Sequence, residues 1–122
     1  MSKRQTIAVR RDFDVIVARS RVRDLARSMG LGTSDQARIS LATSSVARVL
    51  GLGGSNQGEI VIESANGQDR ACVRVTCTFE TSDDDAGGPS SAKFAEARSM
   101  TDEMTVEKLP DNGVRVVLVK WV

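Results

Sequence analysis

Apolar residues change their spacing near the middle of this chain. In two early segments, residues 12–29 and 33–50, they recur every three or four positions, which is the spacing of one face of an α-helix. From residue 60 onward they alternate with polar residues, which is the spacing of a strand with one buried face. Because the two periods favour different structures, we expect two helices early in the chain and strands later.

Both predicted helices have recognisable ends. Asp12 is expected to cap the first helix by accepting a backbone N–H bond, and the helix ends at Gly30-Leu31-Gly32. Thr33 and Gln36 have the spacing of a capping box for the second helix, which stops at residues 51–54. The positions expected to face the core are Val15, Ala18, Val22, Leu25, Ala26 and Met29 in the first helix, and Ile39, Ala42, Val46, Val49 and Leu50 in the second.

The remaining pattern predicts a sheet and a third helix. Asn66-Gly67 favours a tight antiparallel hairpin, and Pro110-Asp111-Asn112-Gly113 favours a second turn. Lys93 to about Met104 is predicted to be helical, with Phe94, Ala97, Met100 and Met104 turned inward. The predicted strands are residues 6–9, around 60–63, 73–79, 105–109 and 114–122. This order predicts an α+β two-layer sandwich, with helices on one face of a mostly antiparallel sheet.

Composition excludes several classes of function. The 122 residues carry 17 basic and 16 acidic side chains, for a net charge of +1, which disfavours a nucleic-acid partner. The chain has no apolar run near the ~20 residues that span a bilayer, so we expect a cytoplasmic protein with no membrane partner. Histidine and tyrosine are absent, which excludes Ser/His/Asp and Cys/His arrangements. We expect one domain, 1–122, with a flexible loop at about 81–92.

Cys72 and Cys77 lie five residues apart in one predicted strand. An odd spacing sends the two side chains to opposite faces of a sheet, where they cannot form a disulfide with each other. We therefore expect two free, buried thiols.

Several blocks of the sequence resemble RsbT-type switch kinases, which belong with the anti-sigma-factor kinases to the GHKL (histidine-kinase-like) ATPase superfamily. The most specific block runs from residue 31 to residue 48. The blocks that carry the resemblance are Asp12-Phe13-Asp14, Ala18-Arg19, residues 31–39, Ala47-Arg48, residues 100–104 and Val119-Lys120-Trp121. The resemblance extends over nearly the whole chain and implies a GHKL ATPase-like fold.

The resemblance also implies where nucleotide-binding residues would lie, and this sequence departs from the pattern there. In the superfamily the second helix carries a Glu that acts on the phosphoryl acceptor and, four residues later, an Asn that holds magnesium; these positions are Ser45 and Val49 here. Residues 76–81 lack the Asp and glycines that read adenine, and only Gly87-Gly88-Pro89 represents the lid. We therefore predict no catalytic, cofactor-binding or metal residue, no cofactor, and a covered surface where the second helix would border the phosphates.

The resulting hypothesis is a non-catalytic, kinase-like protein-binding module in a bacterial partner-switching (anti-sigma and stress signalling) pathway. The resemblance implies a partner such as a STAS-domain antagonist, a phosphatase or a sigma-factor regulator, and leaves a homodimer open. Arg19, Arg23 and Arg27 lie four residues apart on one face of the first helix and are the predicted partner-binding residues, with a solubilising surface as the alternative. The alternative function is an ATP-binding serine/threonine-protein kinase of the anti-sigma regulatory factor type, with ATP and Mg as cofactors.

Three further features have structural interpretations. Asp83-Asp84-Asp85 is expected to be a solvated acidic stretch rather than a metal site. Ser90 and Ser91 are expected to cap a helix rather than accept phosphate. Trp121, the single tryptophan, is expected to anchor the last strand in the core rather than contact a partner.

Overall fold

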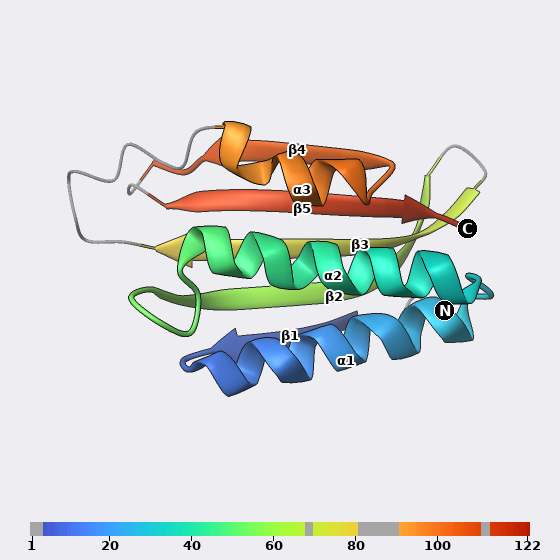
Figure 1. The fold of residues 1–122 in the computed structure, drawn as a ribbon, viewed down its shortest axis with the longest axis horizontal. Coiled ribbons are helices and arrows are strands. Elements are labelled where there is room, and N and C mark those ends of the chain that lie inside the picture. Colours follow the sequence, from blue (N-terminus) through green and yellow to red (C-terminus); the bar gives the residue numbers. More distant parts are fainter. Residues whose placement is uncertain (1–3, 68–69, 81–90, 111–112) are drawn as a thin grey trace.

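The computed structural model has two layers, a sheet and a single layer of helices that covers one of its faces (Figure 1). It describes residues 4–67, 70–80, 91–110 and 113–122. Along these residues the elements are β1 (Arg4–Val9), α1 (Asp12–Ser28), α2 (Thr33–Leu50), β2 (Gln57–Gly67), β3 (Arg70–Glu80), η1 (Ser91–Phe94), α3 (Ala95–Ser99), β4 (Glu103–Lys108) and β5 (Val114–Trp121). The predicted α+β two-layer architecture is confirmed.

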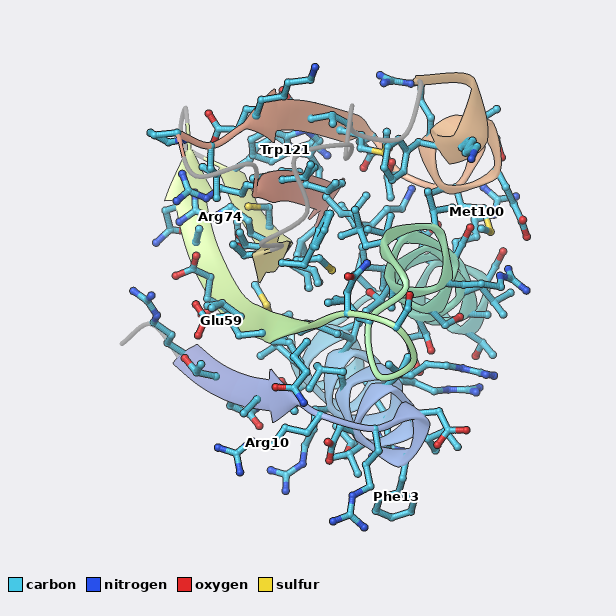
Figure 2. The ribbon with its side chains drawn as sticks, turned by 90° about the vertical axis from the view of Figure 1, so that its left-hand side faces the viewer. Arg10, Phe13, Glu59, Arg74, Met100 and Trp121 are labelled. Carbon is cyan, nitrogen blue, oxygen red and sulfur yellow. The ribbon has the colours of Figure 1, made fainter. Side chains whose placement is uncertain are left out.

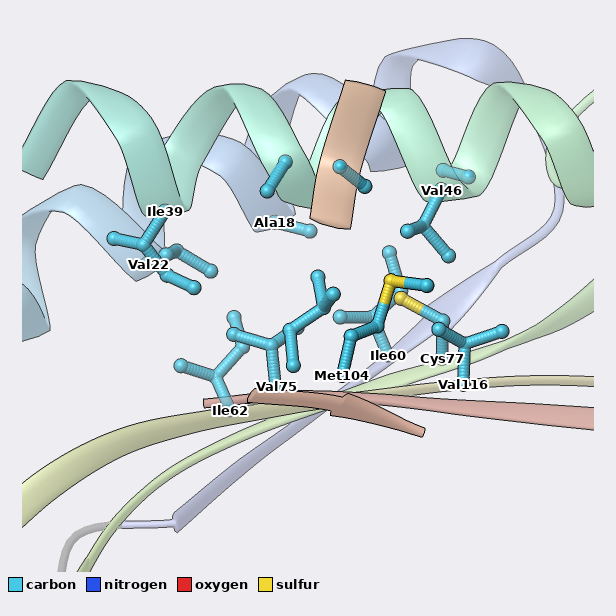
Figure 3. Packing of buried hydrophobic residues seen from close by; sticks show 14 of the residues in the cluster. Ala18, Val22, Ile39, Val46, Ile60, Ile62, Val75, Cys77, Met104 and Val116 are labelled. Carbon is cyan, nitrogen blue, oxygen red and sulfur yellow. The ribbon is translucent and has the colours of Figure 1, made fainter. Parts of the chain in front are cut away.

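The five strands lie in the order β1-β2-β3-β5-β4, and every neighbouring pair is antiparallel. Strand register places apolar side chains in rows that cross the sheet on the helix side. One row crosses all five strands through Ile7, Ile60, Cys77, Val116 and Val106. Figure 3 shows the sheet side chains pointing toward the helices, so the core lies between the two layers.

Each long helix buries one stripe of side chains against this sheet. The buried residues of α1 are Ala18, Val22, Leu25 and Ala26, all of them among the predicted core positions. Ser40 of α2 donates a hydrogen bond from Oγ to the Arg19 carbonyl of α1 at 3.3 Å, which joins the helices at a close approach. In Figure 1 α2 lies between α1 and α3. None of the helices in the described part of the chain is long and apolar enough to cross a membrane.

The third helix is shorter than predicted. The helical turn η1 begins at Ser91, two residues before Lys93, and α3 ends at Ser99. Met104 was predicted to lie in this helix, but it belongs to β4 and pairs with Leu118. The chain leaves the helix because the Asp102 N–H donates to the Val119 carbonyl at 2.9 Å, which begins strand pairing before the helical pattern ends.

The predicted caps were also wrong in detail. Asp14, not Asp12, accepts backbone N–H bonds at the start of α1, from Arg10 at 2.9 Å and from Arg11 at 3.2 Å. These two N–H groups hold the pKa of Asp14 below its ordinary value.

At the start of α2, Gly32 is the N-cap residue and no side chain caps it, so Thr33 lies inside the helix. The Gln36 amide instead donates to the Leu31 carbonyl at 2.8 Å. The β2–β3 hairpin is antiparallel as predicted, but Asn66 and Gly67 belong to β2, because the strands pair as far as Gly67 and Arg70. The two residues between Gly67 and Arg70, where the predicted turn would have to lie, are outside the described residues.

Cys72 and Cys77 are free and buried, as predicted. Cys77 lies in the core between the layers, where burial raises the pKa of its thiol to about 12. Cys72 lies on the opposite, uncovered face of the sheet, and burial raises its pKa as well.

Trp121 does not belong to the core between the layers, so that prediction was wrong. It lies half-buried on the uncovered face, opposite Cys72 in the register and with the Arg70 guanidinium 5.6 Å from its ring centre. Most of the predicted loop at 81–92, including Asp83–Asp85 and Ser90, lies outside the described residues. Ser91 begins η1.

Candidate functional site

The helix that would carry kinase chemistry is α2. Ser45 and Val49 lie one turn apart on this helix. Around the helix axis they are about 100° from Ser44 and Arg48, which lie on the side of α2 that faces α1. Ser45 is only 3% exposed, and Val49 is half-buried and packs against the core. Near neutral pH a hydroxyl cannot act as a carboxylate base, and the valine side chain offers a metal no oxygen.

The end of β3 is the second expected nucleotide contact. Phe79 occupies it, buried in the core and paired with Val114 of β5. Phe94, which has no exposed surface, belongs to the same cluster and ends η1, which contacts α2. Aromatic rings therefore fill part of the layer between this half of α2 and the sheet. Among the residues that the structure describes, no three acidic or cysteine side chains are grouped closely enough to hold a metal ion.

The predicted partner-binding residues all lie on the solvent side of α1. Arg19, Arg23 and Arg27 are exposed. Arg27 forms an ion pair with Asp24 at 3.1 Å, whereas Arg19 and Arg23 have no ion-pair partner in the described part of the chain. Arg21 belongs to another side of the helix and donates to Gln5 of β1 at 3.1 Å.

Exposed apolar side chains on the two long helices were not predicted. Phe13 is 62% exposed and Ile16 60% on α1, and Leu41 is 44% exposed on α2. Figure 2 shows Phe13 projecting away from the body of the molecule near Arg10. The sequence does contain a signal for them, because all three positions are apolar but lie outside the stripes that predict the core.

A shallow groove of about 360 Å³ lies where α1 and α2 diverge. Ile16 lines it from α1, Ser44 and Arg48 line it from α2, and Gly51 and Gly54 lie at its end. Ile16, Leu41, the groove and the arginines Arg19, Arg23 and Arg48 therefore lie on the outer surface of the helical layer. Asp12 of α1 lines the groove as well, and this arrangement can bind another chain.

Two long helices and a short third one thus cover one face of a five-stranded antiparallel sheet. The chain is 24% identical to the serine/threonine-protein kinase RsbT of Bacillus subtilis (strain 168) over 136 residues, covering 99% of this chain and 98% of RsbT. It is thus homologous to RsbT, which confirms the resemblance seen in the sequence. No protein-family model matches the chain.

Solved structures share the fold. The RsbU and RsbW domains of Rv1364c from Mycobacterium tuberculosis match with a TM-score of 0.66 and 19% identity, over 98% of this chain and 32% of theirs. The present chain thus spans about a third of that longer one. The SiaB–SiaC complex from Pseudomonas aeruginosa matches with a TM-score of 0.51 and 10% identity, over 97% of this chain and 89% of the matched chain.

Proposed function

We propose that this protein is a non-catalytic, kinase-like binding module of a bacterial partner-switching pathway, and that it does not bind ATP. Its expected partner is a STAS-domain antagonist, a phosphatase or a sigma-factor regulator, contacted through Arg19, Arg23 and Arg27. Homology to RsbT and the fold shared with the SiaB–SiaC complex support a regulatory role with a protein partner.

The observation that carries the proposal is the pair Ser45 and Val49 on α2. A kinase of this superfamily needs a carboxylate and a metal-binding oxygen at these positions, and the chain provides a buried hydroxyl and a hydrocarbon. Phe79 adds to the argument, because an aromatic ring at the end of β3 cannot accept a hydrogen bond from the adenine amino group.

The alternative is an ATP-binding serine/threonine-protein kinase. It is favoured by one observation, the similarity to a serine/threonine-protein kinase along 99% of the chain. Such an enzyme would bind Mg-ATP with residues displaced from the positions of its relatives.

Thermal unfolding with and without Mg-ATP separates the two functions. A ligand at a hundred times its Kd raises the free energy of unfolding by about 2.7 kcal/mol, so a nucleotide site gives a clear rise in Tm. We expect no rise for this protein and a rise for RsbT of Bacillus subtilis in the same assay. A magnesium-dependent rise, or transfer of phosphate from ATP to a STAS-domain protein of the same organism, would establish the kinase instead.

A further inference from the structure

The outer surface of the helical layer combines apolar and basic side chains. We define the α1–α2 face as Ile16, Arg19, Arg23, Leu41 and Arg48. We propose that this face is a docking surface for an acidic amphipathic helix of a protein partner. The inference rests on the proposed binding function and deepens it, because it adds an apolar site to the arginines and states the chemistry of the partner.

Two exposed apolar side chains lie on this face. Of the four large apolar residues that are exposed within the described part of the chain, Ile16 is on α1 and Leu41 on α2. The other two lie elsewhere, because Phe13 projects away from α2 beside Arg10 (Figure 2) and Val122 follows β5. Clustered exposed apolar side chains are typical of a surface that another molecule covers.

The shape of this surface suits a helix. The groove of about 360 Å³ has Ile16 on one wall and Ser44 on the other. Gly51 and Gly54 line its end and contribute no side chain to it. A helix that carries apolar residues three and four positions apart would place them in such a groove and contact Ile16 and Leu41 on its sides.

Charge specifies the kind of partner. Arg19 and Arg23 have no ion-pair partner in the described part of the chain, and Arg48 lies 3.8 Å from Glu96 in a pair exposed on both sides. An exposed pair of this length contributes little to stability, so Arg48 can exchange Glu96 for a carboxylate of a partner. Guanidinium groups bind carboxylates with two hydrogen bonds, and glutamates flanking the apolar stripe of a helix would meet these three arginines.

The same charges argue against other occupants. A second copy of this chain would bring the arginines of both α1–α2 faces together, and like charges oppose such a dimer. A nucleic acid would place phosphates over Ile16 and Leu41, where apolar side chains offer no hydrogen bond.

A synthetic peptide tests the proposal with the full chain. The probe is a labelled acidic peptide of about 20 residues, with leucines at helical spacing and glutamates on both flanks, and its control has the same composition in scrambled order. Fluorescence anisotropy gives the Kd, and amide chemical shifts locate the site. We expect the ordered peptide to bind, the scrambled one to bind at least tenfold more weakly, and the shifts to lie in α1 and α2.

Matched variants identify the contribution of each side chain. Ile16→Ser and Leu41→Ser should each weaken binding about tenfold, whereas Val122→Ser, which removes an exposed apolar side chain elsewhere, should leave the Kd unchanged. Arg23→Glu should weaken binding mainly at low salt, and Arg4→Glu on β1 should have less than a twofold effect. All of these side chains are exposed, and unchanged Tm values will show that the variants fold.

Four results would overturn the inference: no binding, equal binding of the scrambled peptide, shifts outside α1 and α2, or tighter binding of duplex DNA to this face. Dimerisation through the α1–α2 face would assign it to a second copy. The proposed non-catalytic function is tested separately from the docking surface. A Tm rise with Mg-ATP would show a nucleotide site and contradict that function, whether or not the peptide binds.

Discussion

Lys120 and Asp102 form an ion pair in which Nζ of the lysine lies 3.2 Å from Oδ1 of the aspartate. The same Nζ lies 3.4 Å from Oδ1 of Asp35 in α2, and the other oxygen of Asp102 accepts the Trp121 N–H at 2.8 Å. The side chain of Lys120 is only 11% exposed. One ammonium therefore connects the first turn of α2, the residue before β4 and the end of β5.

Lys120→Met should destabilise the fold. The methionine keeps the buried hydrocarbon stem but leaves the carboxylates of Asp102 and Asp35 without their cation, so we expect a loss of about 1–2 kcal/mol in the free energy of unfolding. Urea denaturation measures it. Arg115→Met is the control, because the pair of Arg115 with Glu107 at 2.9 Å is solvent-exposed and should contribute about 0.5 kcal/mol or less. Equal losses in both variants would contradict a structural role for Lys120.

Stability should fall at acid pH through two carboxylates. Although partial burial opposes it, hydrogen bonds from the Trp121 N–H and from Lys120 hold the pKa of Asp102 below its ordinary value of 3.8. The pKa of Asp14 is also lowered. A lowered folded-state pKa stabilises the fold above the unfolded pKa, and this stabilisation is lost as the pH falls through the folded one.

We therefore expect the free energy of unfolding to decline below about pH 4, with a shallower decline for Asp14→Asn and Asp102→Asn. Denaturant titrations between neutral pH and about pH 2 measure this dependence. A decline of the same slope in the wild type and in both variants would assign acid sensitivity to other groups.

Gly53 should not tolerate alanine, whereas its neighbour Gly54 should. Gly53 has a φ of +81°, and a Cβ there would lie 2.7 Å from the main-chain carbonyl of Arg11. The nearest atom to a Cβ on Gly54 would be the Gly51 oxygen, at an ordinary 3.7 Å. We expect Gly53→Ala to cost about 2 kcal/mol or more and Gly54→Ala less than about 0.5 kcal/mol, measured by thermal unfolding. A tolerated Gly53→Ala would show that the loop can move away from α1.

Local patterns predicted most of the fold because the relevant signals are short-range. Helical spacing identified the buried residues of α1, and alternation identified the faces of β3. The error at Met104 has a physical cause. Met104 lies four residues after Met100, which is a helical spacing, but its pairing with Leu118 of β5 makes it part of a strand. The spacing of nearby apolar residues does not reveal a strand-pairing partner 14 residues further along the chain. The contact of Lys120 with Asp35 joins distant segments in the same way.

The candidate site was predicted in part. The exposure of Arg19, Arg23 and Arg27 follows from their helical spacing, since they lie outside the apolar stripe. The groove depends on how closely α1 and α2 approach, which is set by tertiary contacts such as Ser40 to the Arg19 carbonyl. Sequence spacing within one helix carries no information on that approach.

Restoring the kinase-type residues on α2 should damage the fold before it restores any chemistry. Ser45 is buried, so Ser45→Glu places a carboxylate among apolar neighbours, and we expect a loss of about 3 kcal/mol or more. Val49→Asn, at a half-buried position, should cost about 1 kcal/mol. Ser34→Glu is the matched control, because its side chain is exposed in the first turn of the same helix, where a negative charge is favourable.

The double variant Ser45→Glu, Val49→Asn should also transfer no phosphate from Mg-ATP to a STAS-domain protein, since Phe79 still occupies the end of β3 and no adenine-reading carboxylate is restored there. Urea denaturation of the single variants and a radiolabelled phosphotransfer assay of the double variant measure the two effects. The prediction would be contradicted if the double variant were as stable as the wild type and phosphorylated the STAS domain. That result would show that these two substitutions are enough to restore nucleotide binding and phosphate transfer.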